Sequence, residues 1–388
     1  MYIVKLKQGK EKRALNHPWI YANEVEKITD KGKQGSVCKV VSHDDRLVGY
    51  GFINHLSKII VRFLSRKDEV FDRDFFKRKI SESIEKRNQL GFESSARLVF
   101  SESDGLPGLI VDKYDKCLSV QFLCLGMDLL KNEIVSILAE LLSPECIYER
   151  SDSPVRAKEG LTESVGVLYG TMPEQVIINE NGLNIKVDLI NGQKTGYFLD
   201  QKKNRARFGE YARDKNVLDC FSNVGGFALN ACKGGAKSVL ALDISPLAVE
   251  EIQSNARLNG LTNIQTETVD VFERLRTLKS ENRKFDLICL DPPAFIKSKD
   301  TVKNGFAGYR DINICAMKLL EKNGILFTCS CSHHLTLDLF FEMIRESAIQ
   351  SGSDMSLLEL FIQSPDHSSN VLEEEALYLK VAVLRKNN

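Results

Sequence analysis

The sequence lacks a long hydrophobic stretch: no apolar run approaches the ~18 residues that a membrane-spanning helix needs. Its start, MYIVKLKQGKEKR, also lacks the apolar core and the small-residue cleavage site of a secretory signal. Ten cysteines are present, but no CxxC pair occurs among them. We therefore expect a cytoplasmic protein with no membrane partner, in which most cysteines are reduced packing residues.

An overall charge of one sign is missing too, because 53 Lys and Arg balance 53 Asp and Glu. The balance is uneven along the chain. Residues 1–70 carry 14 basic and 8 acidic side chains, whereas residues 71–185 carry 13 and 19. A basic first segment permits a partner with a phosphate backbone, but a generic solvated surface explains it equally well.

The pattern of apolar residues divides the chain into three segments, 1–70, 71–185 and 186–388. The first contains short strand-like runs at close spacing, which predict a small β-barrel, and a helix-like stretch over 17–25. The second opens with a predicted helix over 72–91, mixes strand and helix signals, and ends in a hairpin around Asn181-Gly182. The sequence shows no internal repeat and no low-complexity stretch.

From residue 186 onward, apolar strand runs alternate with amphipathic helices. This rhythm predicts an α/β domain whose parallel sheet is covered on both faces. Ligands of such sheets bind beyond the carboxyl ends of the strands. The predicted architecture is thus an α/β domain preceded by a barrel and a central α+β domain.

Acidic residues stand at the ends of successive predicted strands. Asp219 precedes a loop with Gly225 and Gly226, and Asp243 and Asp270 end the next two strands. The loop lacks the Lys-Ser/Thr of a phosphate loop, and carboxylates at strand ends accept hydrogen bonds from ribose. Asp243 and Asp270 could equally be helix caps. Three acids favour a nucleoside with a positive end group, such as S-adenosylmethionine.

The fourth strand ends in LDPPAF, where Asp291 is followed by Pro292 and Pro293. The two prolines fix the backbone, and Phe295 is available to stack on an extruded planar base. A simple strand stop followed by a loop is the plainer interpretation.

A later strand ends in TCSCSHHL, residues 328–335. The spacing is too tight for a closed zinc site, and no second cluster supplies the remaining ligands, so we expect no metal. With a side-chain period of two, Cys329 and Cys331 face the same side, and Cys329 lies one pleat deeper. Cys331 is therefore the better nucleophile, since neighbouring cations and hydrogen-bond donors favour a thiolate. His333 and His334 are interpreted as loop histidines.

Several segments together resemble the ribosomal RNA large subunit methyltransferase I family, which makes 5-methylcytosine in 23S ribosomal RNA. The matching segments span nearly the whole chain: HPWIYANEV, ERSDSPVR, TGYFLDQKKNR, DCFSNVGGFAL, LDPPAF, GILFTCSCSHHL and PDH…YLK. The resemblance implies an N-terminal PUA domain that binds RNA, a central domain and a class I (Rossmann-like) methyltransferase domain that uses S-adenosylmethionine.

The resemblance also implies roles for individual residues. Cys331 would be the nucleophile, with Asp291 and Glu375 as further catalytic residues, although the family's prolines near DH and YLK are missing here. The substrate would be contacted by Pro292, Pro293, Phe295 and Lys297. The cofactor would be contacted by Gln201, Asp219, Phe221, Ser222, Asn223, Gly225, Gly226, Asp243, Ile244, Asp270, Val271 and Asp291.

In the implied reaction Cys331 adds to carbon 6 of cytosine, and carbon 5 then attacks the sulfonium methyl. Two other functions remain open: an adenine amino-group methyltransferase that uses the DPPAF turn, and a non-catalytic RNA-binding scaffold. The cysteines argue against the first and the acids against the second. A homodimer is compatible with the sequence, which does not reveal the oligomeric state, the target nucleotide or the proton-abstracting base.

Overall fold

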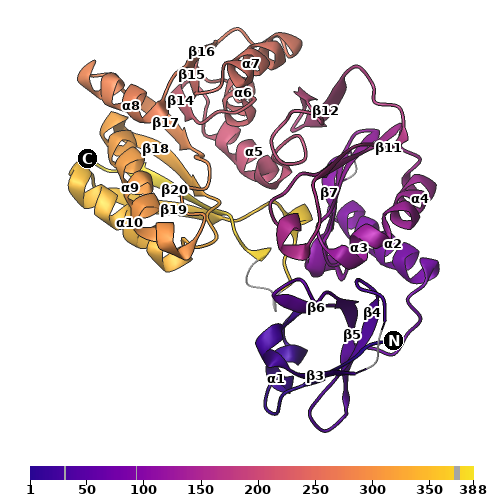
Figure 1. Cartoon of the computed structure of the whole chain (residues 1–388). Helices are drawn as coiled ribbons and strands as arrows, with labels where there is room; N and C mark the ends of the chain where they lie inside the picture. The colour runs from indigo at the N-terminus through magenta and orange to yellow at the C-terminus, as the bar shows by residue number, and fades with distance from the viewer. Residues whose placement is uncertain (30–31, 93, 371–375) are drawn as a thin grey trace. The chain divides into compact units, whose positions relative to one another are not determined.

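The computed structural model describes residues 1–29, 32–92, 94–370 and 376–388. The chain divides into two compact units (Figure 1). Unit 1 comprises Met1–Ile178, Val187–Leu199 and Pro365–Ala376, and unit 2 comprises Asn179–Lys186, Asp200–Ser364 and Leu377–Asn388. Within the described residues, no helix is long and apolar enough to cross a membrane.

Unit 1 begins with a six-stranded sheet in the order β2-β6-β5-β4-β1-β3. Its strands enclose a core that includes Val4, Ile20, Val40 and Val61. The expected helix over 17–25 is wrong: this stretch forms β2 and a single 3-10 turn, because Trp19 and Ile20 pair with β6. The elements are β1 Ile3–Leu6, α1 Glu11–Leu15, β2 Trp19–Tyr21, β3 Val25–Thr29, β4 Val37–Val41, β5 Leu47–Ile53 and β6 Ile59–Ser65.

The rest of unit 1 is a five-stranded sheet in the order β11-β10-β9-β8-β7, with helices packed on it. The predicted helix over 72–91 is confirmed as α2, which is capped by the Asp72 side chain and followed by Gly91 in the left-handed region at φ 79°. The elements are α2 Arg73–Gln89, β7 Ser95–Phe100, β8 Leu109–Tyr114, β9 Cys117–Phe122, α3 Leu125–Leu129, α4 Lys131–Leu142, β10 Cys146–Ser151 and β11 Ser164–Gly170.

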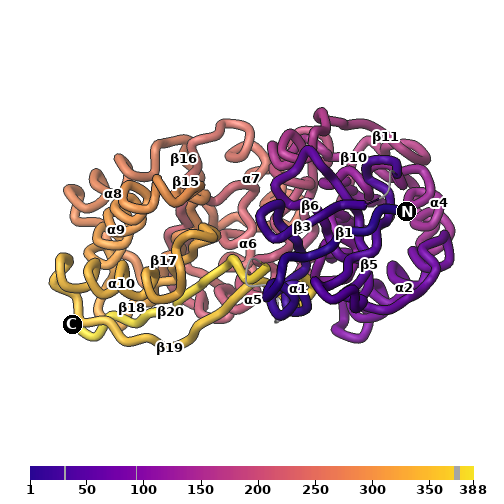
Figure 2. The backbone as a smooth tube through the Cα atoms, turned by 60° about the horizontal axis from the view of Figure 1, so that its bottom comes forward, coloured from indigo at the N-terminus to yellow at the C-terminus, as the bar shows by residue number. Residues whose placement is uncertain are grey.

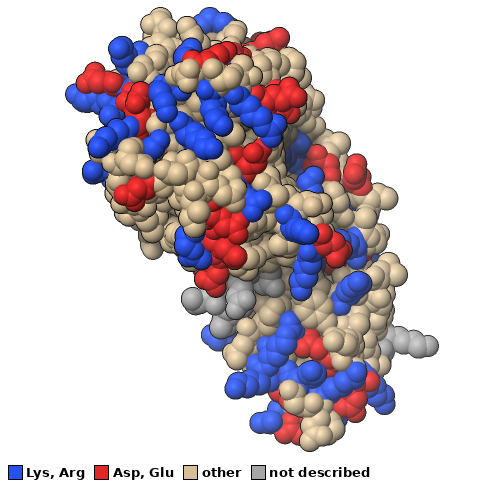
Figure 3. All heavy atoms as spheres, turned by 90° about the vertical axis from the view of Figure 1, so that its left-hand side faces the viewer, with Lys and Arg blue, Asp and Glu red and all other residues tan. Residues whose placement is uncertain are grey.

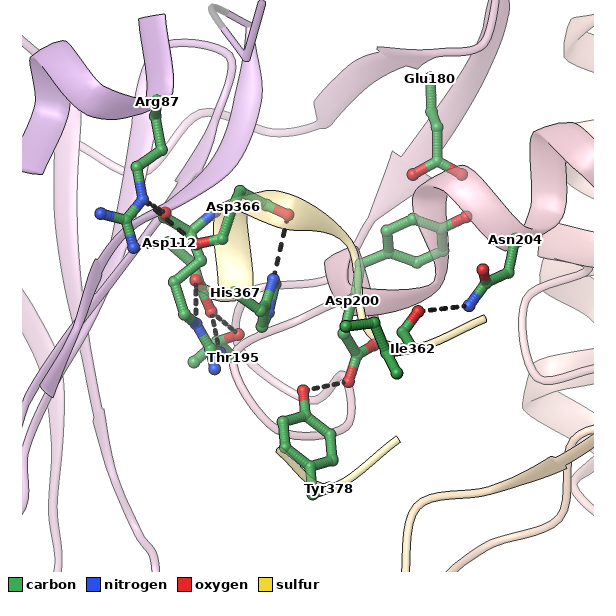
Figure 4. Close-up of polar contacts among 12 residues, drawn as sticks. Arg87, Asp112, Glu180, Thr195, Asp200, Asn204, Ile362, Asp366, His367 and Tyr378 are labelled. Atoms are coloured by element: carbon green, nitrogen blue, oxygen red, sulfur yellow. Dashed lines mark hydrogen bonds and ion pairs between the residues drawn. The ribbon is translucent and has the colours of Figure 1, made fainter. Parts of the chain in front are cut away.

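A buried arginine holds the segment 365–370 within unit 1. The Arg87 side chain is fully buried, donates to both carboxylate oxygens of Asp104 at 2.7 Å, and donates to the Asp366 carbonyl at 2.9 Å. The Asp366 carboxylate in turn accepts from the Arg97 amide at 3.0 Å. Figure 4 shows Arg87 pointing toward Asp366 and His367. The PDH motif therefore has a structural role in unit 1.

The predicted hairpin is confirmed as β12 Val176–Glu180 and β13 Leu183–Val187. Its turn residues Asn181 and Gly182 both have positive φ, 53° and 74°, as a tight two-residue turn requires. Glu180 and Arg205 form a buried, two-pronged ion pair at 2.6 and 2.7 Å. This pair fastens the end of β12 to α5 within unit 2.

Unit 2 is built on a seven-stranded sheet in the order β16-β15-β14-β17-β18-β20-β19. The first five strands are parallel, as predicted, and β20 is inserted antiparallel between β18 and β19. The strands are β14 Asn216–Cys220, β15 Ser238–Asp243, β16 Ile264–Thr268, β17 Phe285–Leu290, β18 Leu320–Ser330, β19 Met355–Phe361 and β20 Lys380–Lys386.

Helices cover both faces of this sheet. The helices α8, α9 and α10 pack on one face and α5, α6 and α7 on the other (Figures 1 and 2). The helices are α5 Lys202–Glu210, α6 Gly226–Lys233, α7 Pro246–Leu258, α8 Val271–Ser280, α9 Val302–Leu319 and α10 Leu337–Ser351. This is the α/β class that the sequence predicts, on a sheet with one antiparallel strand.

On the face drawn in Figure 3, the surface has no large area covered by charges of a single sign. Lys and Arg side chains are interspersed there with Asp and Glu. Long-range attraction of an anionic partner therefore has little support from this face, and local groups of cations matter more.

Candidate active site

Three of the predicted acids, Asp219, Asp243 and Asp291, lie with Cys331 at one edge and on one side of the unit 2 sheet. Val217, Val239, Leu287 and Phe327 belong to the core beneath α5–α7, whereas their even-numbered neighbours belong to the core beneath α8–α10. Continuing the alternation places Asp219, Asp243, Asp291 and Cys331 on the α5–α7 side. Because parallel strands end at the same edge, these side chains converge.

The loop after β14 follows a strained path. Phe221 and Asn223 have positive φ, 62° and 51°, and Gly225 follows at 90°. Such values are rare for residues with a Cβ atom. The Asn223 amide donates to the Asp243 carboxylate at 2.8 Å, and the Ser222 amide donates to the Leu242 carbonyl at 3.0 Å. The loop is thus shaped by β15, and Gly226 opens α6 behind it.

Asp219 is completely buried beside this loop. Its Oδ2 atom accepts from the Ala228 amide at 3.0 Å, but its Oδ1 atom has no hydrogen-bond partner among the described residues. Burial, helped by the negative charges of the nearby Asp291 and Asp243 carboxylates, raises the pKa of Asp219 to about 7. A buried carboxyl with a spare acceptor is suited to bind a positively charged ligand group.

Asp243 is half-buried and accepts from two backbone amides, those of Asn223 and Ser245. Its carboxylate is therefore held in one orientation with lone pairs left for ribose hydroxyls. The next residue, Ile244, is 68% exposed, which leaves an apolar surface free to contact an adenine ring. Asp270 is exposed and caps α8 through the Glu273 amide, and Val271 is packed into the core.

Asp291 accepts a hydrogen bond from a buried pair of side-chain amides, those of Gln201 and Asn204, which are hydrogen-bonded to each other. Gln201, at the start of α5, donates to the Asp291 carboxylate at 3.0 Å, and its own oxygen accepts from Asn204 at 2.7 Å. Asn204 also donates to the Ile362 carbonyl at 3.2 Å, a contact that Figure 4 marks. The structure thus brings together Gln201 of FLDQ and the acid of LDPPAF, although 90 residues separate them in the sequence.

An aromatic cluster follows Asp291. Phe295 lies 4.7 Å from the Tyr309 ring, 5.7 Å from Phe272 and 6.3 Å from Phe221, measured between centroids. Three neighbouring rings therefore hold Phe295 in place, and its side chain stays half-buried and so partly accessible. Of the other predicted substrate residues, Pro292 is buried, and Pro293 and Lys297 are exposed.

The two cysteines of the strand end differ in accessibility. Cys329 is fully buried, and burial raises the pKa of its thiol. Cys331 follows the last residue of β18, is half-buried, and packs at the margin of the same core. The predicted arrangement, with both thiols on one side and Cys329 deeper, agrees with these positions.

Several supporting residues were not predicted from the sequence. The Tyr309 hydroxyl lies 2.9 Å from Ser332 Oγ, and Ser332 Oγ accepts from the Ile296 amide, so the turn after β18 is joined to α9 and to the DPPAF segment. Tyr378 donates to the Asp200 carboxylate at 2.6 Å, as Figure 4 shows. Lys380 donates to the Ser332 carbonyl at 2.9 Å. The one signal in the sequence for a special role of Lys380 is its position as a charged residue within the apolar run YLKVAVL.

Glu375, proposed as a catalytic acid, lies outside the described residues. Its catalytic role therefore stays a prediction of the sequence.

Unit 1 contains a separate cleft of about 390 Å³. Among the residues that line it are His17, Arg66, Lys67, Lys79 and Gly105. The Arg66 guanidinium lies 3.5 Å above the Phe63 ring and donates to the His17 carbonyl at 2.8 Å. Arg66 and Lys67 have no carboxylate within 4.0 Å among the described residues. Two cleft acids, Glu69 and Glu102, are neutralised by Arg78 and Arg62, so the cleft has excess positive charge.

Comparison with known proteins agrees with this geometry. Residues 4–66 match the PUA-like domain family, and residues 161–370 match the S-adenosylmethionine-dependent methyltransferases. The ribosomal RNA large subunit methyltransferase I of Shewanella amazonensis is 41% identical over 98% of this chain and 98% of its own length. That of Aeromonas salmonicida is 41% identical over 99% and 98%. This chain belongs to the ribosomal RNA large subunit methyltransferase I family. It is an S-adenosylmethionine-dependent methyltransferase with an N-terminal PUA-like domain.

Solved structures of other proteins have a fold similar to that of this chain. SMU.776 complexed with SAH has a TM-score of 0.86 at 22% identity, covering 99% of this chain and 100% of that chain. The tRNA m1G37 methyltransferase of M. jannaschii has a TM-score of 0.52 at 19% identity, covering 84% and 82%.

The residues of this family member fit its cofactor. S-adenosylmethionine carries an ammonium group, ribose hydroxyls and an adenine ring. The spare Oδ1 of Asp219 suits the ammonium, the Asp243 carboxylate suits the ribose, and the exposed Ile244 suits the adenine.

We predict that the affinity for S-adenosylmethionine rises as the pH increases from 6 to 7.5. The raised pKa of Asp219 leaves this carboxyl largely protonated below pH 7, and pairing with an ammonium requires the ionised form. Calorimetry across this range should show proton release from the protein. In Asp219→Asn the protein's part of the pH dependence should disappear. An identical pH profile for both proteins would contradict this role.

We also predict that Asp243→Ala weakens S-adenosylmethionine binding by about 1–3 kcal/mol, the scale for losing a charged hydrogen-bond acceptor. Asp72→Ala is the matched control, since Asp72 also caps a helix but belongs to unit 1 and is not among the proposed cofactor residues, so it should leave the affinity unchanged. Equal calorimetric affinities of wild type and Asp243→Ala would reduce Asp243 to a support of the loop.

Proposed function

We propose that this protein methylates carbon 5 of a cytosine in 23S ribosomal RNA through a covalent adduct with Cys331. The observation that carries the proposal is the accessible thiol of Cys331 at the strand edge where Asp219, Asp243 and Asp291 also converge. The names of the relatives at 41% identity support ribosomal RNA as the substrate class and hence a cytoplasmic site of action.

The chemistry explains why a thiol is needed. Carbon 5 of cytosine is a poor nucleophile until the Cys331 thiolate adds to carbon 6 and the ring becomes enamine-like. Carbon 5 can then attack the methyl group that S-adenosylmethionine supplies as an electrophile. Removal of the carbon-5 proton by a base re-forms the double bond between carbons 5 and 6 and expels the thiolate.

The other residues of the site have matching roles in this proposal. Asp291, oriented by Gln201, accepts a hydrogen bond from the protonated cytosine ring. Phe295, fixed by Tyr309 and Phe272, offers a face on which the base can stack after leaving its helix. Pro293 and Lys297 are exposed on the same segment and are available to the neighbouring nucleotides.

The cleft in unit 1 supports RNA as the partner. Arg66 is positively charged at neutral pH even though burial lowers its pKa to about 10, and Lys67 and Lys79 line the same cleft. Among the described residues, Arg66 and Lys67 have no carboxylate within 4.0 Å, and Lys79 has only Glu82 at 3.7 Å, so these cations are suited to bind phosphates. In this proposal the cleft holds the RNA backbone.

The cysteine assignment predicts a trapped adduct. Wild-type protein incubated with S-adenosylmethionine and 23S RNA containing 5-fluorocytosine should form a covalent complex, because fluorine at carbon 5 cannot be removed as a proton. Cys331→Ala should form none and transfer no methyl group, while it still binds S-adenosylmethionine. Gel shift and peptide mass mapping report the adduct and its cysteine.

Cys329→Ala is the matched control, since it also removes a cysteine thiol, at the buried position one pleat deeper in the strand. It should lose some stability but still transfer methyl groups and form the adduct. Trapping through Cys329 would reverse the assignment. Full activity without either cysteine would instead favour methylation of an adenine amino group, which needs no thiol.

The cleft assignment predicts that Lys67→Glu/Lys79→Glu weakens RNA binding and raises the Michaelis constant for RNA. The slope of log affinity against log salt should fall by about one for each phosphate that the variant no longer binds. Lys27→Glu/Lys39→Glu changes the charge equally on strands β3 and β4, which do not line the cleft, and should have little effect. Equally weakened binding in both double variants would mean that only net charge matters.

A further inference from the structure

Lys380 is a buried lysine next to the proposed nucleophile. It is 8% exposed and stands at the first position of β20, directly opposite Ser330 on β18. Its Nζ atom donates to the Ser332 carbonyl at 2.9 Å. Cys331 is the residue between these two serines, so Lys380 holds the backbone on both sides of the thiol.

The charge of Lys380 has little compensation. Among the described residues, no carboxylate lies within 4.0 Å of its Nζ atom, and the Ser332 carbonyl is its one hydrogen-bond acceptor. Burial lowers the pKa of Lys380 to about 8, while the negative charge of a Cys331 thiolate acts in the opposite direction and raises it. A buried ammonium without a carboxylate is costly, and a thiolate would offset that cost.

We propose that Lys380 is a positioning residue for Cys331. The Lys380 ammonium group fixes the turn after β18 and favours the thiolate form of Cys331. Electrostatic attraction between the ammonium and the thiolate stabilises the reactive form before the RNA arrives. The proposal rests on Cys331 as the nucleophile for its catalytic meaning, but the ionisation of the thiol can be measured independently of catalysis.

Two further titratable groups of the described residues, Tyr309 and Asp291, do not supply a positive charge here. Tyr309, from α9, is neutral because burial raises the pKa of its hydroxyl to about 12. Asp291, after β17, is an acid whose charge raises the pKa of the adjacent Cys329 thiol and so opposes a thiolate. His333 follows in the same turn, and its ring lies 5.3 Å from that of His334. Lys380 is thus the lysine placed to act on this thiol from the sheet.

The test is the pH dependence of Cys331 alkylation by iodoacetamide in the full-length protein, followed by mass spectrometry of the peptide that contains Cys331. The wild-type rate should rise at a lower pH than the rate of Lys380→Met, with midpoints that differ by about one pH unit or more. Lys380→Arg keeps a positive charge at every accessible pH and should restore the low midpoint.

Methyl transfer should follow the same order, with kcat reduced at pH 7 in Lys380→Met and largely restored in Lys380→Arg. Affinity for S-adenosylmethionine and the thermal midpoint serve as controls for folding, and Lys380→Gln replaces Lys380→Met if the latter does not fold. Identical alkylation profiles in wild type and in the neutral variant would overturn the proposal. A shifted profile with no adduct to 5-fluorocytosine RNA would preserve the role of Lys380 but refute Cys331 as the nucleophile.

Discussion

The alternation of side chains along parallel strands determines which groups the active site can contain. Asp219 pairs with Ala241 on one side and with Cys289 on the other, and all three face α5–α7. A slip of one residue in β14 would turn Asp219 into the core beneath α8–α10, where no ligand can reach it. The register, rather than any single contact, therefore places the carboxylates and the thiol together. The buried side chains of both faces hold that register.

This placement has a cost in stability. Among the described residues, Asp219 is buried without a counter-charge and Lys380 without a carboxylate partner. Phe221 and Asn223 have left-handed backbone conformations. Each of these features is unfavourable for folding when considered alone. Their concentration at one edge of one sheet is the expected signature of a site in which ligand binding supplies the missing partners.

The sequence predicts the parts of the fold that depend on local pattern. Continuous apolar runs identify the strands of unit 2, and Asn181-Gly182 identifies the hairpin, because both signals are carried by neighbouring residues. The helix α9 begins at Val302, although its first turns contain Gly305 and Gly308, which are poor helix formers and give no local signal of a helix. The structure requires a glycine at 305, because a Cβ atom there would come within 2.3 Å of Ile296. Likewise, the hydrogen bonds of Gln201 with Asp291 and of Lys380 with Ser332 join distant segments, so no local pattern indicates them.

The insertion of β20 between β18 and β19 has a consequence for how the chain folds. Among the strands that the structure describes, β20 alone pairs with β19, although β19 precedes β20 in the sequence. Until β20 is in place, β18 remains an open edge and β19 has no partner strand. β19 carries Leu357, Leu358 and Leu360, which stay at least 42% exposed even in the folded chain. Non-local pairing of this kind is slow, and an unpaired apolar strand promotes association between chains. Docking of β20 is therefore the step that covers the β18 edge and gives β19 its partner strand.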